Sequence, residues 1–191
     1  MTSQDRVRES AEAVRAWCRQ NAPLTAAALL PGDSPDVICR AERVTGQVWP
    51  EDLKAWLEVQ GGRVEAEMAK SALFPVAFMP LGAPAIAAEW RSLVDLWADQ
   101  ADSEVFSEAT RNQAGDFAQV WIPQFVPVAS EVFGSHLLVD LSGGPLHGCV
   151  CEWDGDQGWQ EVRWPSVAVM LDELLAGLES DRLGSYPGGP G

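Results

Sequence analysis

The stretch that most constrains the fold of this chain is residues 135–164, which reads as three short strands joined by two turns. In the first strand, Leu137, Val139 and Leu141 occupy every second position, the pattern of a strand with one buried face. The Ser-Gly-Gly-Pro sequence at 142–145 interrupts this pattern, because glycine tolerates positive φ and proline lacks the N–H that a strand ladder needs. A second run of strand residues leads into a glycine-containing hairpin turn, and a third run closes the meander. Such a ribbon buries too little surface alone, so the sequence predicts helices packed against it.

Residues 34–62 carry the signals of a helical hairpin. Ser34 is a good N-cap before a proline at the first helical position, and Gly46 is a typical C-terminal stop. A second helix is expected to open at Trp49-Pro50 and to end at Gly61-Gly62.

The remaining segments are predicted as follows. Residues 5–20 form an amphipathic helix, and a strong apolar stripe predicts another helix after Pro84. The prolines in 71–81 and 120–128 restrict each of these segments to an edge strand at most. Residues 120–164 then form the strand meander, 166–180 a leucine-rich closing helix, and 184–191 a flexible Gly/Pro tail, which gives one domain over 1–183.

The charge of the chain is strongly acidic. Its 191 residues carry 28 Asp and Glu against 13 Lys and Arg, a formal net charge of −15. Such a surface repels phosphate backbones, so we expect no direct nucleic-acid binding, whereas a basic protein partner would be attracted. The alternative interpretation is that the excess acid serves solubility only.

We expect a cytoplasmic protein with no membrane segment. The polar N-terminus does not resemble a signal peptide, and no apolar run approaches the length of a membrane span. The four cysteines have no disulfide-framework spacing, which is typical of reduced thiols.

The meander contains residue types that can bind metal ions. His147, Cys149 and Cys151 occur at every second position and would share one face of a strand, which suggests the beginning of a zinc site. Strand neighbours at that spacing lie about 6.5–7 Å apart, which is long for ligands of one ion, and no fourth ligand is identifiable. The Asp-Gly-Asp-Gln-Gly turn also fails as a calcium loop, because the twelfth position is Pro165 or Arg163 instead of glutamate. We therefore expect buried core thiols and no metal or other cofactor.

Catalysis is not expected either. Ser135 and His136 are adjacent, but neighbouring strand residues face opposite sides, and no nucleophile-elbow pattern surrounds them. The chain has two histidines and no phosphate-binding glycine loop.

Short motifs in a fixed order resemble those of a known family. They are Trp49, Pro50, Leu57, Gly61, Gly62, Trp121, Pro123, Asp140, Gly148 and Trp153. Together with the closing helix, this order resembles the SUKH superfamily, which is named partly after fungal cell-wall assembly regulators and consists largely of bacterial immunity proteins. Trp49 replaces the leucine that usually precedes this proline, and the loop at 129–134 is short for the family.

The resemblance implies an α+β fold, with a twisted, largely antiparallel sheet and helices packed against it. It also implies no enzymatic activity. Members bind and neutralise toxin domains, often nucleases or deaminases, whereas the fungal relatives act as regulatory scaffolds. A small-molecule enzyme or sensor is a third hypothesis. The oligomeric state stays open.

We expect a protein partner, possibly a basic toxin domain, to contact the acidic segment 99–116 and the hairpin 154–161. The candidate residues are Asp99, Asp102, Glu104, Glu108, Glu152, Asp154, Asp156, Trp159 and Glu161. Most of the nine tryptophans are expected in the core, and any left exposed near the hairpin turn would serve as an interface anchor.

Overall fold

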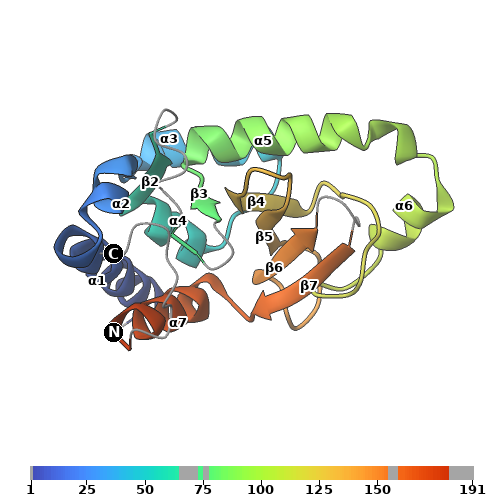
Figure 1. The fold of residues 1–191 in the computed structure, drawn as a ribbon. Helices are drawn as coiled ribbons and strands as arrows, with labels where there is room; N and C mark the ends of the chain where they lie inside the picture. Colours follow the sequence, from blue (N-terminus) through green and yellow to red (C-terminus); the bar gives the residue numbers. More distant parts are fainter. Residues whose placement is uncertain (1, 65–72, 75–77, 155–158, 181–191) are drawn as a thin grey trace.

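The computed structural model describes residues 2–64, 73–74, 78–154 and 159–180 (Figure 1). Its helices are α1 (Ser3–Asn21), α2 (Pro23–Ala28), α3 (Pro35–Thr45), α4 (Glu51–Leu57), α5 (Ala83–Leu96), the 3-10 helix η3 (Ala98–Gln100), α6 (Glu104–Ala109) and α7 (Val167–Glu179). Its strands are β1 (Leu29–Pro31), β2 (Gln60–Arg63), β3 (Met79–Pro80), β4 (Phe125–Ser130), β5 (His136–Asp140), β6 (Cys149–Asp154) and β7 (Trp159–Trp164). The chain is therefore α+β, as its sequence predicts.

A five-stranded antiparallel sheet in the order β3-β4-β5-β6-β7 forms the centre of the fold. Strands β5, β6 and β7 are the predicted meander. The prediction of one buried face was wrong for β5, because all its residues from His136 to Asp140 are buried. Leu137 and Val139 face one apolar core and Leu138 faces another, so both sides of this strand are covered.

Strand β4 differs from its prediction in two ways. It is not an edge strand, because it lies between β3 and β5; the pairing with β3 is at Ala129 and Ser130, beyond Pro127, where the missing N–H does not interrupt it. It also begins later than the sequence predicts. The expected strand at 120–128 starts only at Phe125, because Pro123 and Gln124 form a turn in which the Phe125 N–H donates to the Ile122 carbonyl at 3.0 Å. The edge-strand prediction for 71–81 is confirmed in its last part, since β3 lies at the end of the sheet and pairs only with Ala129 and Ser130 of β4.

One face of the sheet, which we call the helix face, is covered by regular helices. Helix α1 packs against α4 and α7, and its buried side chains include Val7, Val14 and Cys18 (Figure 1). A complete capping box at Thr2 and Asp5 fixes the start of α1. The predicted cap of α7 is confirmed, because the Ser166 hydroxyl accepts a hydrogen bond from the Val169 N–H.

The predicted helical hairpin is present as α3 and α4. Gly46 adopts the left-handed conformation at the end of α3, with φ of 64°. The connection is fixed by side chains: the Glu42 carboxylate accepts from the Trp49 backbone N–H at 2.8 Å and pairs with Lys54 at the same distance. The buried Trp49 indole N–H donates to the Thr45 hydroxyl. Both the backbone and the side chain of this tryptophan are therefore hydrogen-bonded to α3.

The prediction for Gly61-Gly62 was wrong. Helix α4 ends at Leu57, and both glycines lie in β2. At Gly62 the backbone has φ of +104°, and a Cβ atom there would lie 2.5 Å from the Gly82 nitrogen. Glycine is required because two backbone segments cross in direct contact.

The opposite face of the sheet, which we call the arm face, is covered by residues 98–122, the arm. In the sequence this stretch stands out only as the acidic segment 99–116, but the arm contains η3 and α6 and contributes Ala109, Ala114, Ala118 and Trp121 to the second apolar core. Figure 1 shows it continuing from α5 and returning beside the sheet. The segment is a packed cover of the sheet.

Among the helices of the described residues, none has the length and apolar character needed to cross a membrane.

Candidate functional site

The arm face is built around an aromatic cluster. The Trp121 ring makes edge-on contacts with Phe125, His136 and Trp153, with centroid distances of 5.6, 5.8 and 5.5 Å. Trp97, at the end of α5, adds a further edge-on contact to Trp153 at 5.9 Å. Such contacts stabilise a core beyond the burial of its large rings.

The carboxylate of Asp140 fastens the arm to the sheet. One oxygen accepts from the Gly115 N–H and the other from the Ser142 N–H, each at 2.9 Å. The Ala114 N–H donates to the Gly143 carbonyl at 2.8 Å, beside the same carboxylate. A buried carboxylate that accepts backbone hydrogen bonds is held in place strongly, so Asp140 acts here as a structural clamp.

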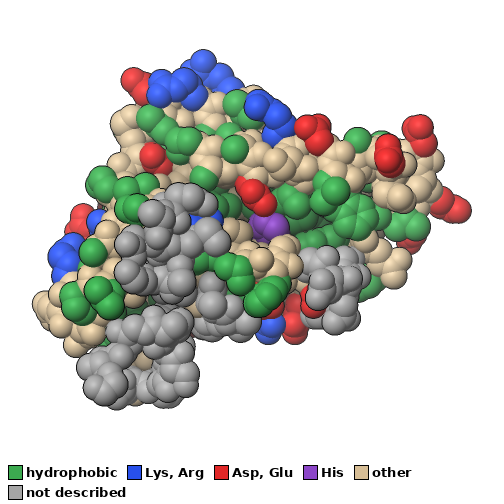
Figure 2. Space-filling model, turned by 45° about the horizontal axis from the view of Figure 1, so that its top comes forward, with side chains coloured by type: hydrophobic (Ala, Val, Ile, Leu, Met, Phe, Trp, Pro, Cys, Tyr) green, Lys and Arg blue, Asp and Glu red, His purple; other side chains and the backbone are tan. Residues whose placement is uncertain are grey.

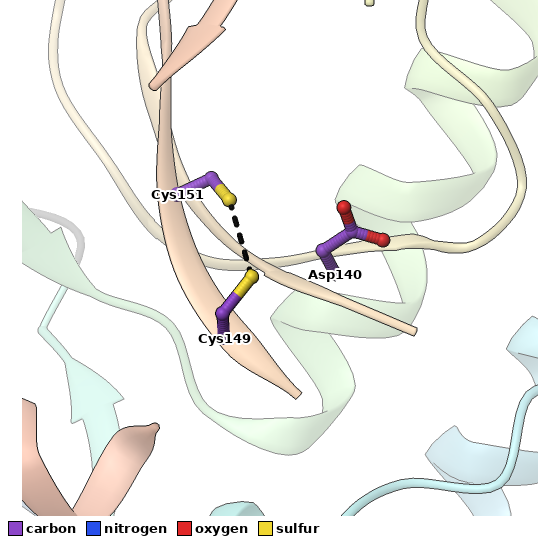
Figure 3. Close-up of side chains that lie close together, drawn as sticks. All are labelled: Asp140, Cys149 and Cys151. Atoms are coloured by element: carbon purple, nitrogen blue, oxygen red, sulfur yellow. Dashed lines mark hydrogen bonds between the residues drawn. The ribbon is translucent and has the colours of Figure 1, made fainter. Parts of the chain in front are cut away.

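Beside this clamp lie two buried thiols. Figure 3 shows Cys149 and Cys151 of β6 pointing toward one another next to Asp140, with their sulfurs 3.6 Å apart. The strand-spacing argument against a shared ion was therefore wrong, because these side chains converge although their backbones do not. His147 does not join them; its Nδ1 lies 3.0 Å from the Ser142 carbonyl.

Within the described part of the chain, Asp140, Cys149 and Cys151 are the one group with the ligand spacing of a metal site. The protonation and hydrogen bonding of these three side chains fit a buried core better than a metal-binding site. Both Asp140 oxygens already accept backbone N–H groups. The hydrogen bond with Cys149 and then burial raise the pKa of Cys151, which favours the thiol over the thiolate that binds metals.

A second polar pair, formed by the buried His136 and the partly exposed Glu89, joins α5 to the sheet. His136 Nε2 lies 2.9 Å from a carboxylate oxygen of Glu89, and the histidine is almost fully buried. The hydrogen bond from His136 lowers the pKa of Glu89. This contact links α5 to β5, and its geometry supports a structural role in orienting α5.

The first part of the arm, residues 98–109, carries four exposed acidic residues. Asp99, Asp102, Glu104 and Glu108 are all exposed, and none forms an ion pair among the described residues. Figure 2 shows Asp and Glu side chains gathered at the right-hand end, where Figure 1 places α6, with Lys and Arg mainly elsewhere on this face. These four carboxylates, which we call the arm acids, therefore lie together.

A small groove lies beside the arm acids, between α6 and the segment that follows it. Its volume is about 240 Å³. This α6 groove is lined by Val105, Glu108, Ala109, Asn112, Phe117, Ala118 and Gln119. Val105 and Phe117 are 42% and 57% exposed, so apolar surface remains open to solvent beside carboxylates.

The hairpin residues predicted to join the arm acids lie elsewhere. Glu152 pairs with Glu161 across β6 and β7, on the opposite side of the sheet from the buried Cys151. Arg163 binds both carboxylates, with oxygen contacts of 2.7 and 3.4 Å. Their charge is therefore partly neutralised, and the structure does not unite them with the arm acids in one surface.

Three further hairpin residues were predicted to contact a partner. Asp154 is partly exposed at the end of β6. Trp159 pairs with it through the backbone of β7. Asp156 lies outside the described residues. Trp153, which was a candidate anchor near this turn, is buried in the aromatic cluster.

The sequence reasoning missed an exposed aromatic residue at the β4–β5 turn. Phe133 is 84% exposed. The Glu131 carboxylate accepts from the N–H groups of Phe133 and Ser135 at 2.7 Å each, so the turn is well ordered. The signal was present: a Val-Phe-Gly sequence between two apolar strands places a large side chain at a turn.

Comparison with protein families assigns the chain to a known family. The model of the SMI1 / KNR4 family (SUKH-1) matches residues 34–173, well over half of the chain. The chain belongs to this family. A comparison with curated proteins gave no match.

Several residues that the sequence resemblance singled out have structural roles in this SUKH-1 member. Asp140 clamps the arm, Trp121 and Trp153 form the aromatic cluster, and Gly62 permits the backbone crossing. Gly148 lies against Pro50: a Cβ on the glycine would meet the proline ring at 3.4 Å. These contacts connect the helical hairpin, the sheet and the arm.

Proposed function

We propose that this protein is a non-catalytic binding module that acts as an immunity protein, which covers and neutralises a basic toxin domain of the nuclease or deaminase type. The observation that carries this proposal is the group of arm acids, which are exposed and not ion-paired among the described residues. Membership of the SUKH-1 family supports a protein-binding role.

Electrostatic attraction explains how such a surface would work. Nucleases and deaminases that act on nucleic acids hold a phosphate backbone with Lys and Arg side chains. An acidic surface of similar charge density competes for that basic cleft, and it also accelerates encounter with it. The net charge of −15 adds to the same long-range attraction.

Co-expression tests the proposal. The protein is produced in bacteria together with each toxin domain encoded beside its gene, and growth and complex formation are measured. We expect one such toxin to be bound and its toxicity suppressed. If every neighbouring toxin remains active and unbound, the immunity role is wrong.

A pair of variants tests whether the arm acids provide the attraction. In the neutralising complex, Glu104→Gln combined with Glu108→Gln should lower the association rate roughly ten-fold at low salt, because charge complementarity acts mainly on this rate. Glu9→Gln combined with Glu12→Gln removes the same charge from exposed positions of α1 and should leave the rate nearly unchanged. Equal effects of the two pairs would assign the attraction to net charge alone.

A regulatory scaffold without a toxin is the second candidate, because the matching family model is that of SMI1 and KNR4. Gene neighbourhood separates the two. A gene beside signalling components, with a stable complex formed by one of those proteins, would favour the scaffold.

A further inference from the structure

We propose that the α6 groove receives one arginine side chain of the basic partner. This inference deepens the proposed function by naming the anchor that the acidic surface binds. The groove is smaller than the roughly 300–1,000 Å³ of pockets for drug-sized ligands, at about 240 Å³. It is therefore suited to a single side chain presented by a protein.

The walls of the groove match the two parts of an arginine. Val105 and Ala109 provide an apolar wall for the aliphatic stem, as long charged side chains commonly bury their methylene groups on apolar surface. The Phe117 ring is exposed and can hold a guanidinium over its face. Apolar contact and cation attraction are thus available at adjacent positions.

Two polar groups select for guanidinium over ammonium. Asn112, which lines the groove, donates from Nδ2 to the Phe117 carbonyl at 3.0 Å, so its Oδ1 remains an acceptor for a bound cation. Glu108 supplies a carboxylate that makes no ion pair among the described residues. A planar fork with five N–H donors can bond both acceptors at once, whereas an ammonium is a single point of charge.

The groove is also formed before binding. Ala109 and Ala118 in its floor belong to the buried core of the arm face, and the Asn112 hydrogen bond fixes the segment that carries Phe117. A rigid site loses less conformational entropy when it binds, so a weak groove of this size can still contribute to affinity.

The test uses hexa-arginine and hexa-lysine peptides added to the full-length ¹⁵N-labelled protein. We expect hexa-arginine to shift the amide resonances of the groove residues first and to bind more tightly than hexa-lysine. Glu108→Gln and Phe117→Leu should each weaken hexa-arginine binding by about two- to five-fold, the range of an exposed cation–π contact or ion pair. Glu12→Gln is the matched control on exposed α1 surface and should change binding by less than half as much.

Shifts spread evenly over acidic surface, or unchanged binding by Phe117→Leu, would overturn the inference. These results are separate from the toxin test. If a toxin is neutralised equally well by the wild-type protein and by Phe117→Leu, the arginine-binding role of the groove is wrong, whereas the immunity role stands. If hexa-arginine binds in the groove but no toxin is neutralised, the immunity role is wrong, whereas the arginine site stands. Because both side chains are exposed, thermal unfolding should match the wild type and confirm that each variant folds.

Discussion

The two faces of the central sheet are covered by different kinds of structure. On the helix face, side chains of α1, α4 and α7, including Trp56, form one apolar core with the valines and leucines of β4, β5 and β6. On the arm face, a largely irregular segment covers the sheet with aromatic rings and backbone hydrogen bonds to Asp140. The helix face depends on apolar area, whereas the arm face also depends on a few specific polar contacts.

Because of this difference, the residues that stabilise the arm are distinct from the exposed residues that we propose bind a partner. The arm is anchored from inside by Trp121 and Asp140, so its outer side is free to carry charge. The arm acids and the α6 groove lie on that outer side. A change there alters the binding surface and leaves the packed residues in place.

The largest expected effect compares one buried tryptophan from each face. Trp121→Ala and Trp56→Ala should each lower the free energy of unfolding by about 3–5 kcal/mol, the usual cost of removing a large buried aromatic ring. Both residues are 1% exposed. Urea unfolding followed by circular dichroism measures the two values. A cost for Trp121→Ala below about 1 kcal/mol would mean that the arm is not an integral part of the core.

The next largest expected effect on the free energy of unfolding is at the backbone crossing between Gly62 and Gly82. Gly62→Ala should cost roughly 2–4 kcal/mol, because it adds a clash with Gly82 to the strain of positive φ. Gly46→Ala is the control, since its φ of +64° is also positive but no atom lies within 4 Å of the new methyl group. It should cost about 1–2 kcal/mol. Equal losses in thermal unfolding would remove the steric part of the argument.

Removing half of the Asp140 clamp tests the polar contacts of the arm face. In Asp140→Asn, one backbone N–H loses a charged acceptor and faces an amide donor, which should cost about 1.5–3 kcal/mol. Hydrogen exchange should accelerate at Gly115 and Ala114 more than at α1. Uniform acceleration across both faces would show that the clamp stabilises the whole molecule and not the arm in particular.

The smallest expected effect is a pH dependence at the pair that joins α5 to the sheet. The pKa of Glu89 is lowered by the hydrogen bond from His136, so the folded state favours the charged carboxylate. Its stabilisation is present above the unfolded pKa of about 4.3 and is lost as the pH falls through the lower folded pKa.

Glu89→Gln should therefore reduce the loss of stability below about pH 4.3, by less than about 1 kcal/mol because the carboxylate is 39% exposed. Thermal unfolding between pH 3 and 7 measures the change, with the exposed Glu12→Gln as the control. Identical profiles for the wild type and Glu89→Gln would contradict the proposed contribution.

Much of the helix face could be predicted from the sequence because its signals are local. Ser166 and Gly46 mark helix ends through their own backbone chemistry, and the stripes of α1 and α7 repeat at helical spacing. Gly61-Gly62 was misassigned because a glycine pair signals a helix end and a close backbone contact equally well.

The arm face could not be predicted in the same way. Its buried residues in 109–118 are alanines with no period, and short polar helices such as α6 give little signal. The convergence of Cys149 with Cys151 and the clamp at Asp140 depend on which loop reaches the sheet, which is a tertiary property. The family resemblance identified the residues of the clamp but not their contacts.

The part of the chain that matches the family model is shorter than the part that forms the folded domain, because the match excludes α1. The family match begins at residue 34, after α1, yet α1 supplies Val7, Ala11 and Val14 to the apolar core. Ser10 donates to Asp172 of α7 at 2.8 Å, and Arg8 pairs with Glu58 beyond α4 at 2.7 Å. A fragment cut at the limits of the match would expose the apolar sides of α4 and α7 to water. A stable recombinant domain therefore has to include the first helix, even though the family signature does not.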